Sequence, residues 1–170
     1  MKMTELFFAE LERETPLTRR VLERVPEGRN DWKPHPKSMP LGYLATLVAT
    51  IPSWIAMMVT QNELDFDPPG GKRYSPPQPN TNRELLEAFD QSVAKARNAL
   101  QSTSDEHLMT NWRFLTGGRV VSEQPRYVVM RDGVLNHLAH HRGQLTVYLR
   151  LNDVPVPSIY GPSADERPFD

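Results

Sequence analysis

The segment 125–152 constrains the fold most, because its apolar residues recur at the three- and four-residue spacing of one long helix. Pro125 suits the first turn of a helix, and Pro155 lies just beyond the predicted end. We therefore predict one continuous helix over this segment. Its central sequence is NHLAHHRGQL, Asn136 to Leu145.

Four polar side chains of this helix fall on one stripe when successive residues are turned by about 100°. They are His137, His141, Gln144 and Tyr148. Leucines occupy the neighbouring angles: Leu135, Leu138, Leu145, Leu149 and Leu151. An exposed polar face would not need an apolar border. The pattern therefore predicts that His137 and His141 turn toward the interior of an all-α protein.

Three further segments carry helical periodicity. The first covers residues 4–25, and Pro16 inside it should cause a kink or a short break. The second covers residues 41–61 and should bend at Pro52. The third begins near Asn82, which we interpret as its N-cap. With the last helix these segments predict a four-helix bundle.

Proline-rich segments connect the predicted helices. Residues 29–40 should be extended, with Trp32 as a packing anchor, and residues 67–82 should form a surface loop. The sequence WRFLTGGRVVS, which begins at Trp112, has a glycine pair between two β-prone runs and predicts a small hairpin before the last helix. A chain of this length is expected to form a single domain over residues 1–170.

Composition excludes several classes of function. The formal net charge is -1, and no basic patch is interleaved with aromatic residues, which argues against nucleic-acid binding. Cysteine is absent, so disulfides, thiolate metal sites and a cysteine nucleophile are excluded. The N-terminal sequence has acidic residues directly after a very short apolar patch and does not resemble a signal peptide. We expect a cytoplasmic protein.

The stretch 38–62 has no charged residue and is long enough to span a bilayer. It contains Pro40, Gly42 and Pro52, together with several hydroxyl residues. The centre of a soluble bundle also requires a helix that is apolar on all sides. We therefore interpret the stretch as a core helix rather than a membrane span.

His137 and His141 lie four residues apart on one helix, which is a standard way to present two imidazoles to one divalent metal ion. The alternative is a pair of core histidines satisfied by polar neighbours. His140 should lie at the edge of this face, while His35 and His107 are interpreted as surface or capping residues. A complete metal site needs a third ligand.

Two residues after the histidines carry packing information. Arg142 should pair with an acidic residue on another helix or with the chain terminus. Gly143 costs on the order of 1 kcal/mol in a helix interior relative to alanine, which suggests that another helix approaches it closely.

Several motifs together resemble the DinB superfamily of bacterial proteins. They are WKPHPKSMPLGYLA, IPSW, NHLAHHRGQLTVYLR and VPVPSIYGPSADE, in this order, and the resemblance extends from Leu11 to Glu166. It implies a four-helix bundle, commonly homodimeric, with a divalent metal ion held by three histidines. Two of these match His137 and His141. Some members resemble thiol-dependent transferases and isomerases, and many have no assigned reaction.

The third histidine of the family belongs in the run LGYLATLVA, where this chain has Leu47. Leucine cannot bind a metal ion. His35 cannot substitute for the missing histidine, because it lies twelve residues upstream, roughly 18 Å away along a helix. The resemblance therefore implies a metal site that lacks one protein ligand.

Two hypotheses of function follow. In the first, His137 and His141 hold Zn²⁺ or Ni²⁺, Gln144 and Tyr148 line the pocket, and the protein is a metal-dependent hydrolase or a thiol-dependent transferase. In the second, the protein is a metal-free, non-catalytic relative that binds a small molecule or acts as a dimeric interaction protein. A homodimer and a small-molecule ligand are the expected partners, and neither nucleic acid nor a membrane is expected.

Overall fold

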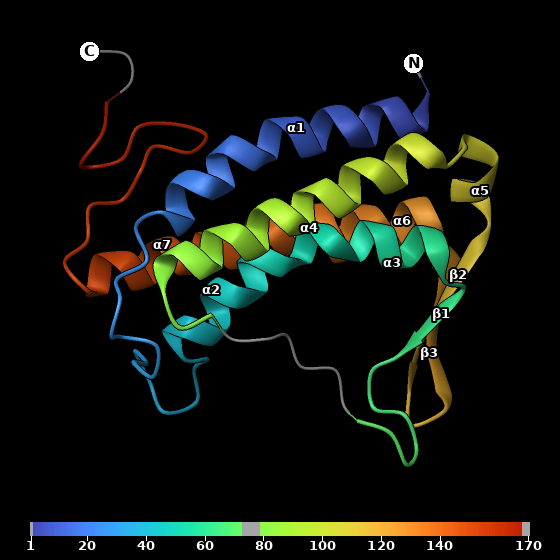
Figure 1. Cartoon of the computed structure of the whole chain (residues 1–170), viewed down its shortest axis with the longest axis horizontal. Helices are drawn as coiled ribbons and strands as arrows, with labels where there is room; N and C mark the ends of the chain where they lie inside the picture. Colours follow the sequence, from blue (N-terminus) through green and yellow to red (C-terminus); the bar gives the residue numbers. More distant parts are fainter. Residues whose placement is uncertain (1, 73–78, 168–170) are drawn as a thin grey trace.

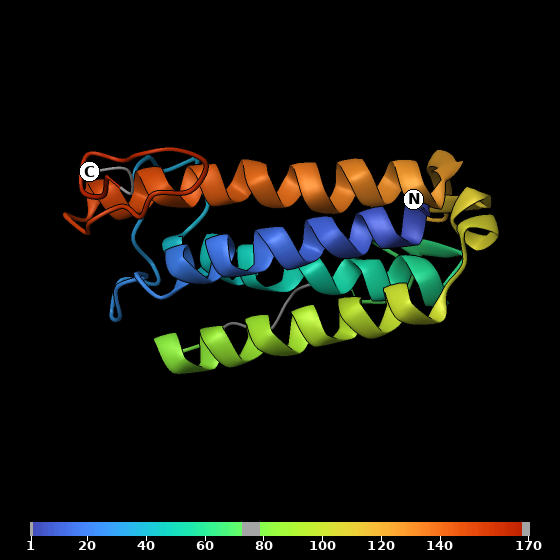
Figure 2. The ribbon, with the colours of Figure 1, turned by 90° about the horizontal axis from the view of Figure 1, so that it is seen from above.

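The computed structural model describes residues 2–72 and 79–167, and within them four helical rods lie side by side (Figure 1). Two rods are single helices, α1 (Met3–Leu22) and α4 (Asn82–Ser102). Another consists of α2 (Leu41–Thr50), the 3₁₀ turn η1 (Ile51–Ser53) and α3 (Trp54–Thr60). The last consists of α6 (Arg126–Met130), the π-helical segment η2 (Arg131–Asn136) and α7 (His137–Leu151). Both α1 and α2 contact α4 and α7, which closes the bundle (Figure 2).

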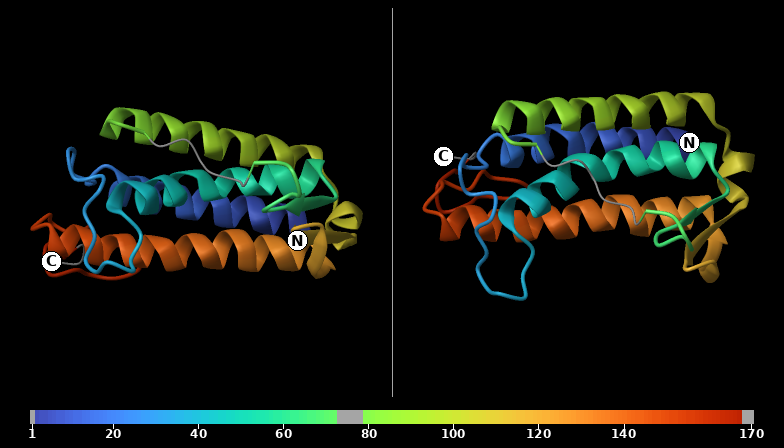
Figure 3. Two further views of the ribbon diagram at one scale, coloured as in Figure 1. Left: turned by 90° about the horizontal axis from the view of Figure 1, so that it is seen from below. Right: turned by 60° about the horizontal axis from the view of Figure 1, so that its bottom comes forward.

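A small three-stranded sheet lies at one end of the bundle (Figure 3). The predicted hairpin is present as β2 (Asn111–Thr116) and β3 (Arg119–Pro125), which pair antiparallel. Gly117 and Gly118 connect them with positive φ angles of 62° and 75°, which glycine adopts without a steric penalty. The strand β1 (Glu63–Asp65) pairs parallel with β2 and was not predicted. The observed fold therefore matches the predicted all-α four-helix bundle only roughly, because it also contains this sheet.

Two prolines within the rods have different effects on the helices that contain them. Pro52 lies in the 3₁₀ turn between α2 and α3, so the bend predicted there is present. Pro16, in contrast, lies inside α1, which continues on both sides, so of the predicted kink or short break the break is wrong. The N-cap of α4 is Thr81 rather than Asn82, and its hydroxyl accepts a hydrogen bond from the Glu84 amide at 3.2 Å.

The rod that contains α2 and α3 supplies much of the buried core. The stretch Leu41–Thr60 is long and apolar enough to cross a membrane by length and composition alone. More than half of its most apolar window, 56%, is nevertheless buried inside the protein. Its apolar character is thus accounted for by packing within the bundle.

Candidate functional site

The two histidines lie at the junction between η2 and α7. The last rod was predicted as a regular helix, but a six-residue π-helical segment precedes His137. Such segments often occur at functional sites. His137 is half-buried, whereas His141 is buried, with 8% of its surface exposed. The predicted inward orientation of the pair is thus observed.

The rings face each other through their Nε2 atoms, which lie 2.7 Å apart. His141 Nδ1 lies 2.7 Å from Gln144 Oε1, and His137 Nδ1 lies 3.3 Å from the Gly133 carbonyl oxygen. Oxygen atoms at both Nδ1 positions favour the tautomers that carry hydrogen there. Two neutral rings of that kind would direct their Nε2 lone pairs at each other. The arrangement therefore favours a shared cation, either a proton or a metal ion, between the two Nε2 atoms.

Burial determines the charge of the separate rings. Desolvation is the largest influence on both residues, and it lowers the pKa of His137 and the pKa of His141 below the ordinary value of the side chain. Burial therefore favours the neutral form of each ring taken separately, and neutral imidazole is the form that binds metal ions.

The donor set matches only part of the three-histidine centre that the resemblance implies. Among residues 2–72 and 79–167, no group of three or more histidine or acidic side chains is arranged to hold a metal ion. Leu47 is buried in α2 and offers no donor atom. Two nitrogen ligands of a tetrahedral zinc ion are about 3.3 Å apart, so the rings would have to separate slightly. The site thus supplies two ligands and does not fit a complete three-histidine centre.

Gln144 and Tyr148, which were expected to line the pocket, have other contacts. Gln144 binds His141, and the Tyr148 hydroxyl donates to the Met39 carbonyl at 3.1 Å. The Tyr148 ring also packs edge-on against Trp32, the anchor predicted from the sequence. Both residues therefore support α7 and the segment before α2.

The other histidines are not brought into the pair's hydrogen bonds. His140 is exposed, although its ring lies 4.9 Å from that of His141. His35 is exposed and accepts a hydrogen bond from the Lys37 amide. His107 lies in the short helix α5 (Asp105–Met109) and contacts the Val59 carbonyl at 3.0 Å.

An apolar pocket of about 370 Å³ opens beside His137. The inner face of the sheet forms one wall, and α3 with the α6–η2 segment forms the other. The Trp54 ring lies 5.4 Å from the His137 ring and links the pocket to the histidine pair. The lining residues are Trp54, Met57, Met58, Leu64, Phe66, Trp112, Phe114, Ser122, Val129, Gly133 and His137. His141, Gln144 and Tyr148 are not among them.

Sequence reasoning did not find this pocket. The available signal was the alternation of Trp112 and Phe114, two aromatic residues that share one face of a strand. Nothing in the sequence shows, however, that this face stands apart from α3 and leaves a cavity. Arg126, buried behind the pocket, was also missed.

The fold and the site define a helix-bundle protein with a histidine pair beside an apolar pocket. The model of the DinB superfamily matches residues 10–145. The chain belongs to the DinB superfamily, as the sequence motifs indicated.

Similar proteins support this assignment. The chain is 26% identical over 112 residues to the uncharacterized protein YrdA of Bacillus subtilis, a match that covers 66% of this chain and 62% of that relative. A DinB-like protein of Bacillus cereus has a TM-score of 0.72 at 24% identity, over 92% of this chain and 97% of the other. The DinB-like YjoA of B. subtilis has a TM-score of 0.68 at 15% identity, over 91% and 97%. At these identities, the two structures show a shared fold.

Proposed function

We propose that this protein binds a small, mainly apolar molecule in the pocket beside the histidine pair. The observation that carries the proposal is the pocket itself. A cavity of about 370 Å³ lined by aromatic and methionine side chains has the size and character of a small-molecule site. His137 adds a polar group whose pKa is lowered by burial, as is common at functional sites.

The neutral fluorescent probe N-phenyl-1-naphthylamine tests this proposal. Its emission should rise on binding to the wild-type protein, because the pocket removes the probe from water. Ser122→Phe should abolish the rise, because Ser122 lines the pocket and the larger ring would fill it. Val120→Phe is the matched control, since Val120 lies on the same strand, is 51% exposed and does not line the pocket. Equal binding by both variants would argue against the pocket as the binding site.

Divalent-metal binding is the second candidate, and the opposed Nε2 atoms of His137 and His141 favour it. Two imidazoles would leave the remaining coordination positions to water or to a ligand. The hydrolase or thiol-transferase activities implied by the resemblance would depend on this ion. Gln144, which contacts Nδ1 of His141, would orient that ring.

Calorimetric titration of chelator-treated, tag-free protein with Zn²⁺ and Ni²⁺ tests the second candidate. His137→Ala and His141→Ala should abolish binding, whereas His140→Ala, the exposed neighbour, should not. Leu47→His should raise the affinity by about tenfold or more, if it restores the third ligand at the matching family position. Absence of binding by both the wild type and Leu47→His would reject this candidate.

A further inference from the structure

We propose that the pocket selects apolar molecules that carry a carboxylate over those that carry an ammonium group. The inference rests on the proposed function, because it names the chemical class of the ligand for that same pocket. Two features support it: the polar groups that the lining offers, and a buried positive charge behind the wall.

The side chains that line the pocket include no carboxylate, lysine or arginine. Ser122 lines the pocket, and its hydroxyl makes no hydrogen bond to another group in the described part of the chain. Trp112, whose ring also lines the pocket, has an indole N–H that is buried without an acceptor among the described residues. Unpartnered donors in a buried wall favour a ligand that brings an acceptor.

Arg126 supplies the positive charge. It is only 2% exposed, and its guanidinium donates to the carbonyls of Met58 at 2.8 Å, Asn111 at 2.8 Å and Gln61 at 3.2 Å. It also donates to Thr110 Oγ1 and to Asn62 Oδ1. All five partners are neutral. No carboxylate in residues 2–72 or 79–167 forms an ion pair with Arg126.

This charge lies close to the cavity. Arg126 holds the backbone of Met58, which lines the pocket, and of Asn111, which precedes the pocket residue Trp112. A charge that burial shields from water acts over a longer distance than an exposed charge. The pocket should therefore have a positive potential, which stabilises a ligand carboxylate and destabilises an ammonium group.

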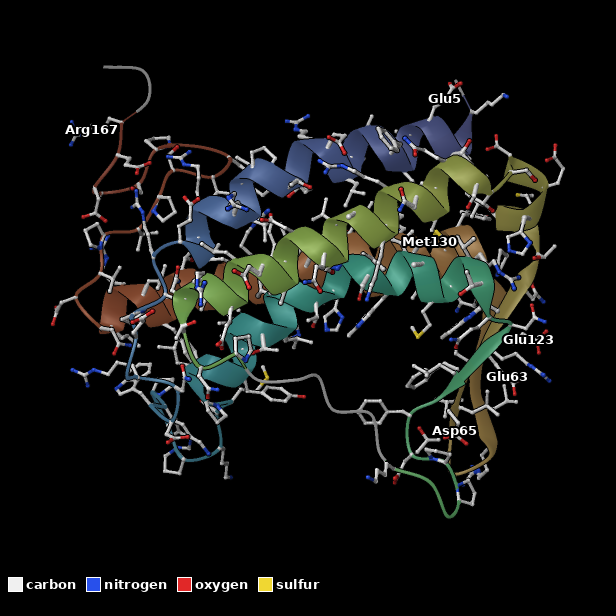
Figure 4. All side chains as sticks on the ribbon, in the orientation of Figure 1. Glu5, Glu63, Asp65, Glu123, Met130 and Arg167 are labelled. Carbon is white, nitrogen blue, oxygen red and sulfur yellow. The ribbon has the colours of Figure 1, made fainter. Side chains whose placement is uncertain are left out.

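The acidic residues of the sheet, which are Glu63, Asp65 and Glu123, do not line the pocket. Asp65 accepts hydrogen bonds from the amides of Gly117 and Gly118 in the hairpin turn. Glu63 pairs with Arg113, and Glu123 accepts a hydrogen bond from the Asn111 side chain. Both glutamates are exposed and lie opposite Arg113 in the strand register, which places them on the face away from Trp112 and Phe114. Figure 4 labels the two glutamates at the sheet end of the bundle. Water screens charges on that outer face.

Calorimetry at pH 7.5 with three ligands of one shape tests the inference: 2-naphthoate, 2-naphthalenemethanol and 2-naphthylmethylammonium. We expect the carboxylate to bind most tightly and the ammonium at least about tenfold more weakly. Tighter or equal binding of the alcohol or the ammonium would overturn the inference but leave the proposed function intact. Failure of all three ligands and of N-phenyl-1-naphthylamine to bind would overturn both.

Variants identify the source of the preference. Arg126→Met should bring the affinities for carboxylate and ammonium close together, whereas Arg126→Lys should keep their order. Arg113→Met removes the same formal charge from the outer face of the sheet and should leave the preference unchanged. Ser122→Ala should weaken carboxylate binding.

Circular dichroism checks the fold of each variant, and the wild-type ligand series decides the proposal if Arg126→Met does not fold. A preference that persists in folded Arg126→Met would show that Arg126 is not its source.

Discussion

Two buried arginines show how single residues are accommodated in this protein. Arg126 is surrounded by neutral acceptors, whereas Arg142 forms an ion pair with Glu14 of α1 at 2.7 Å. The Arg142 side chain is 2% exposed and also donates to Thr18 and to the Tyr160 hydroxyl. Tyr160 in turn donates to Glu14. The network joins α1, α7 and the C-terminal segment.

Glu14→Ala should lower the free energy of unfolding by about 3–5 kcal/mol, because it leaves the Arg142 charge buried without its partner. Glu12→Ala, on the same helix, is the matched control. It breaks an ion pair with Arg97 in which both side chains are 40% exposed, so the loss should stay below about 1 kcal/mol. Urea unfolding measures both values. Similar losses for the two variants would contradict the assigned role of the buried pair.

For single residues, the sequence predicts contacts correctly mainly where the partners lie close together in the chain. The spacing of His137 and His141 was enough to bring their rings together, and Arg142 pairs with an acidic residue of another helix as expected. The expectation for Gly143 was wrong, because it is exposed and a Cβ atom there would meet nothing within 4 Å. The environment of Arg126 depends on residues up to 68 positions away, which no local pattern reveals.

At the scale of elements, the rods follow from periodicity, but the short elements do not. The strand β1 has three residues, and its parallel pairing with β2 joins segments about fifty residues apart. Neither propensity nor spacing predicts such a pairing. The helix α5 has five residues, which is too short for an apolar period to reveal it. The pocket wall depends on β1 and β2, which is why the pocket could not be predicted either.

The start of α1 is capped by a residue of another element. Asp105, the first residue of α5, accepts hydrogen bonds from the amides of Met3 and Thr4, both at 2.9 Å, and from the Thr4 hydroxyl at 3.0 Å. The Thr4 amide and then the Met3 amide are the main causes that lower the pKa of Asp105. The charged carboxylate is thus favoured in the folded state.

This cap predicts a specific dependence of stability on pH. Because the pKa of Asp105 is lower in the folded than in the unfolded protein, its contribution is complete above the unfolded value of about 3.9 and is lost as pH falls through the folded value. Asp105→Asn should therefore lower Tm at pH 7, and its difference from the wild type should shrink below about pH 4. Asp31→Asn, an exposed substitution, should change Tm little. A difference that stays constant from pH 7 to pH 3 would contradict the charge-dependent cap.

At the scale of the whole molecule, the two ends have different roles. The pocket lies at the end with the sheet, whereas the C-terminal segment after α7 lies at the opposite end (Figure 1). Glu166 holds this segment through ion pairs with Arg20 and Arg24 of the α1 end and through a hydrogen bond from the Ser158 amide at 2.9 Å. No local sequence pattern indicates these ion pairs, because their partners lie more than 140 positions apart in the chain.

The separation of the ends predicts that they respond independently to substitution. Glu166→Ala should increase amide hydrogen exchange around Ser158, because the carboxylate that accepts its N–H and pairs with both arginines is lost. Glu87→Ala, which removes only a 4.0 Å contact with Arg83 on the exposed face of α4, should leave that exchange unchanged. Binding of N-phenyl-1-naphthylamine should be the same in both variants, since distant sites without shared partners behave additively. A loss of probe affinity in Glu166→Ala would show that the C-terminal segment and the pocket are coupled through the bundle.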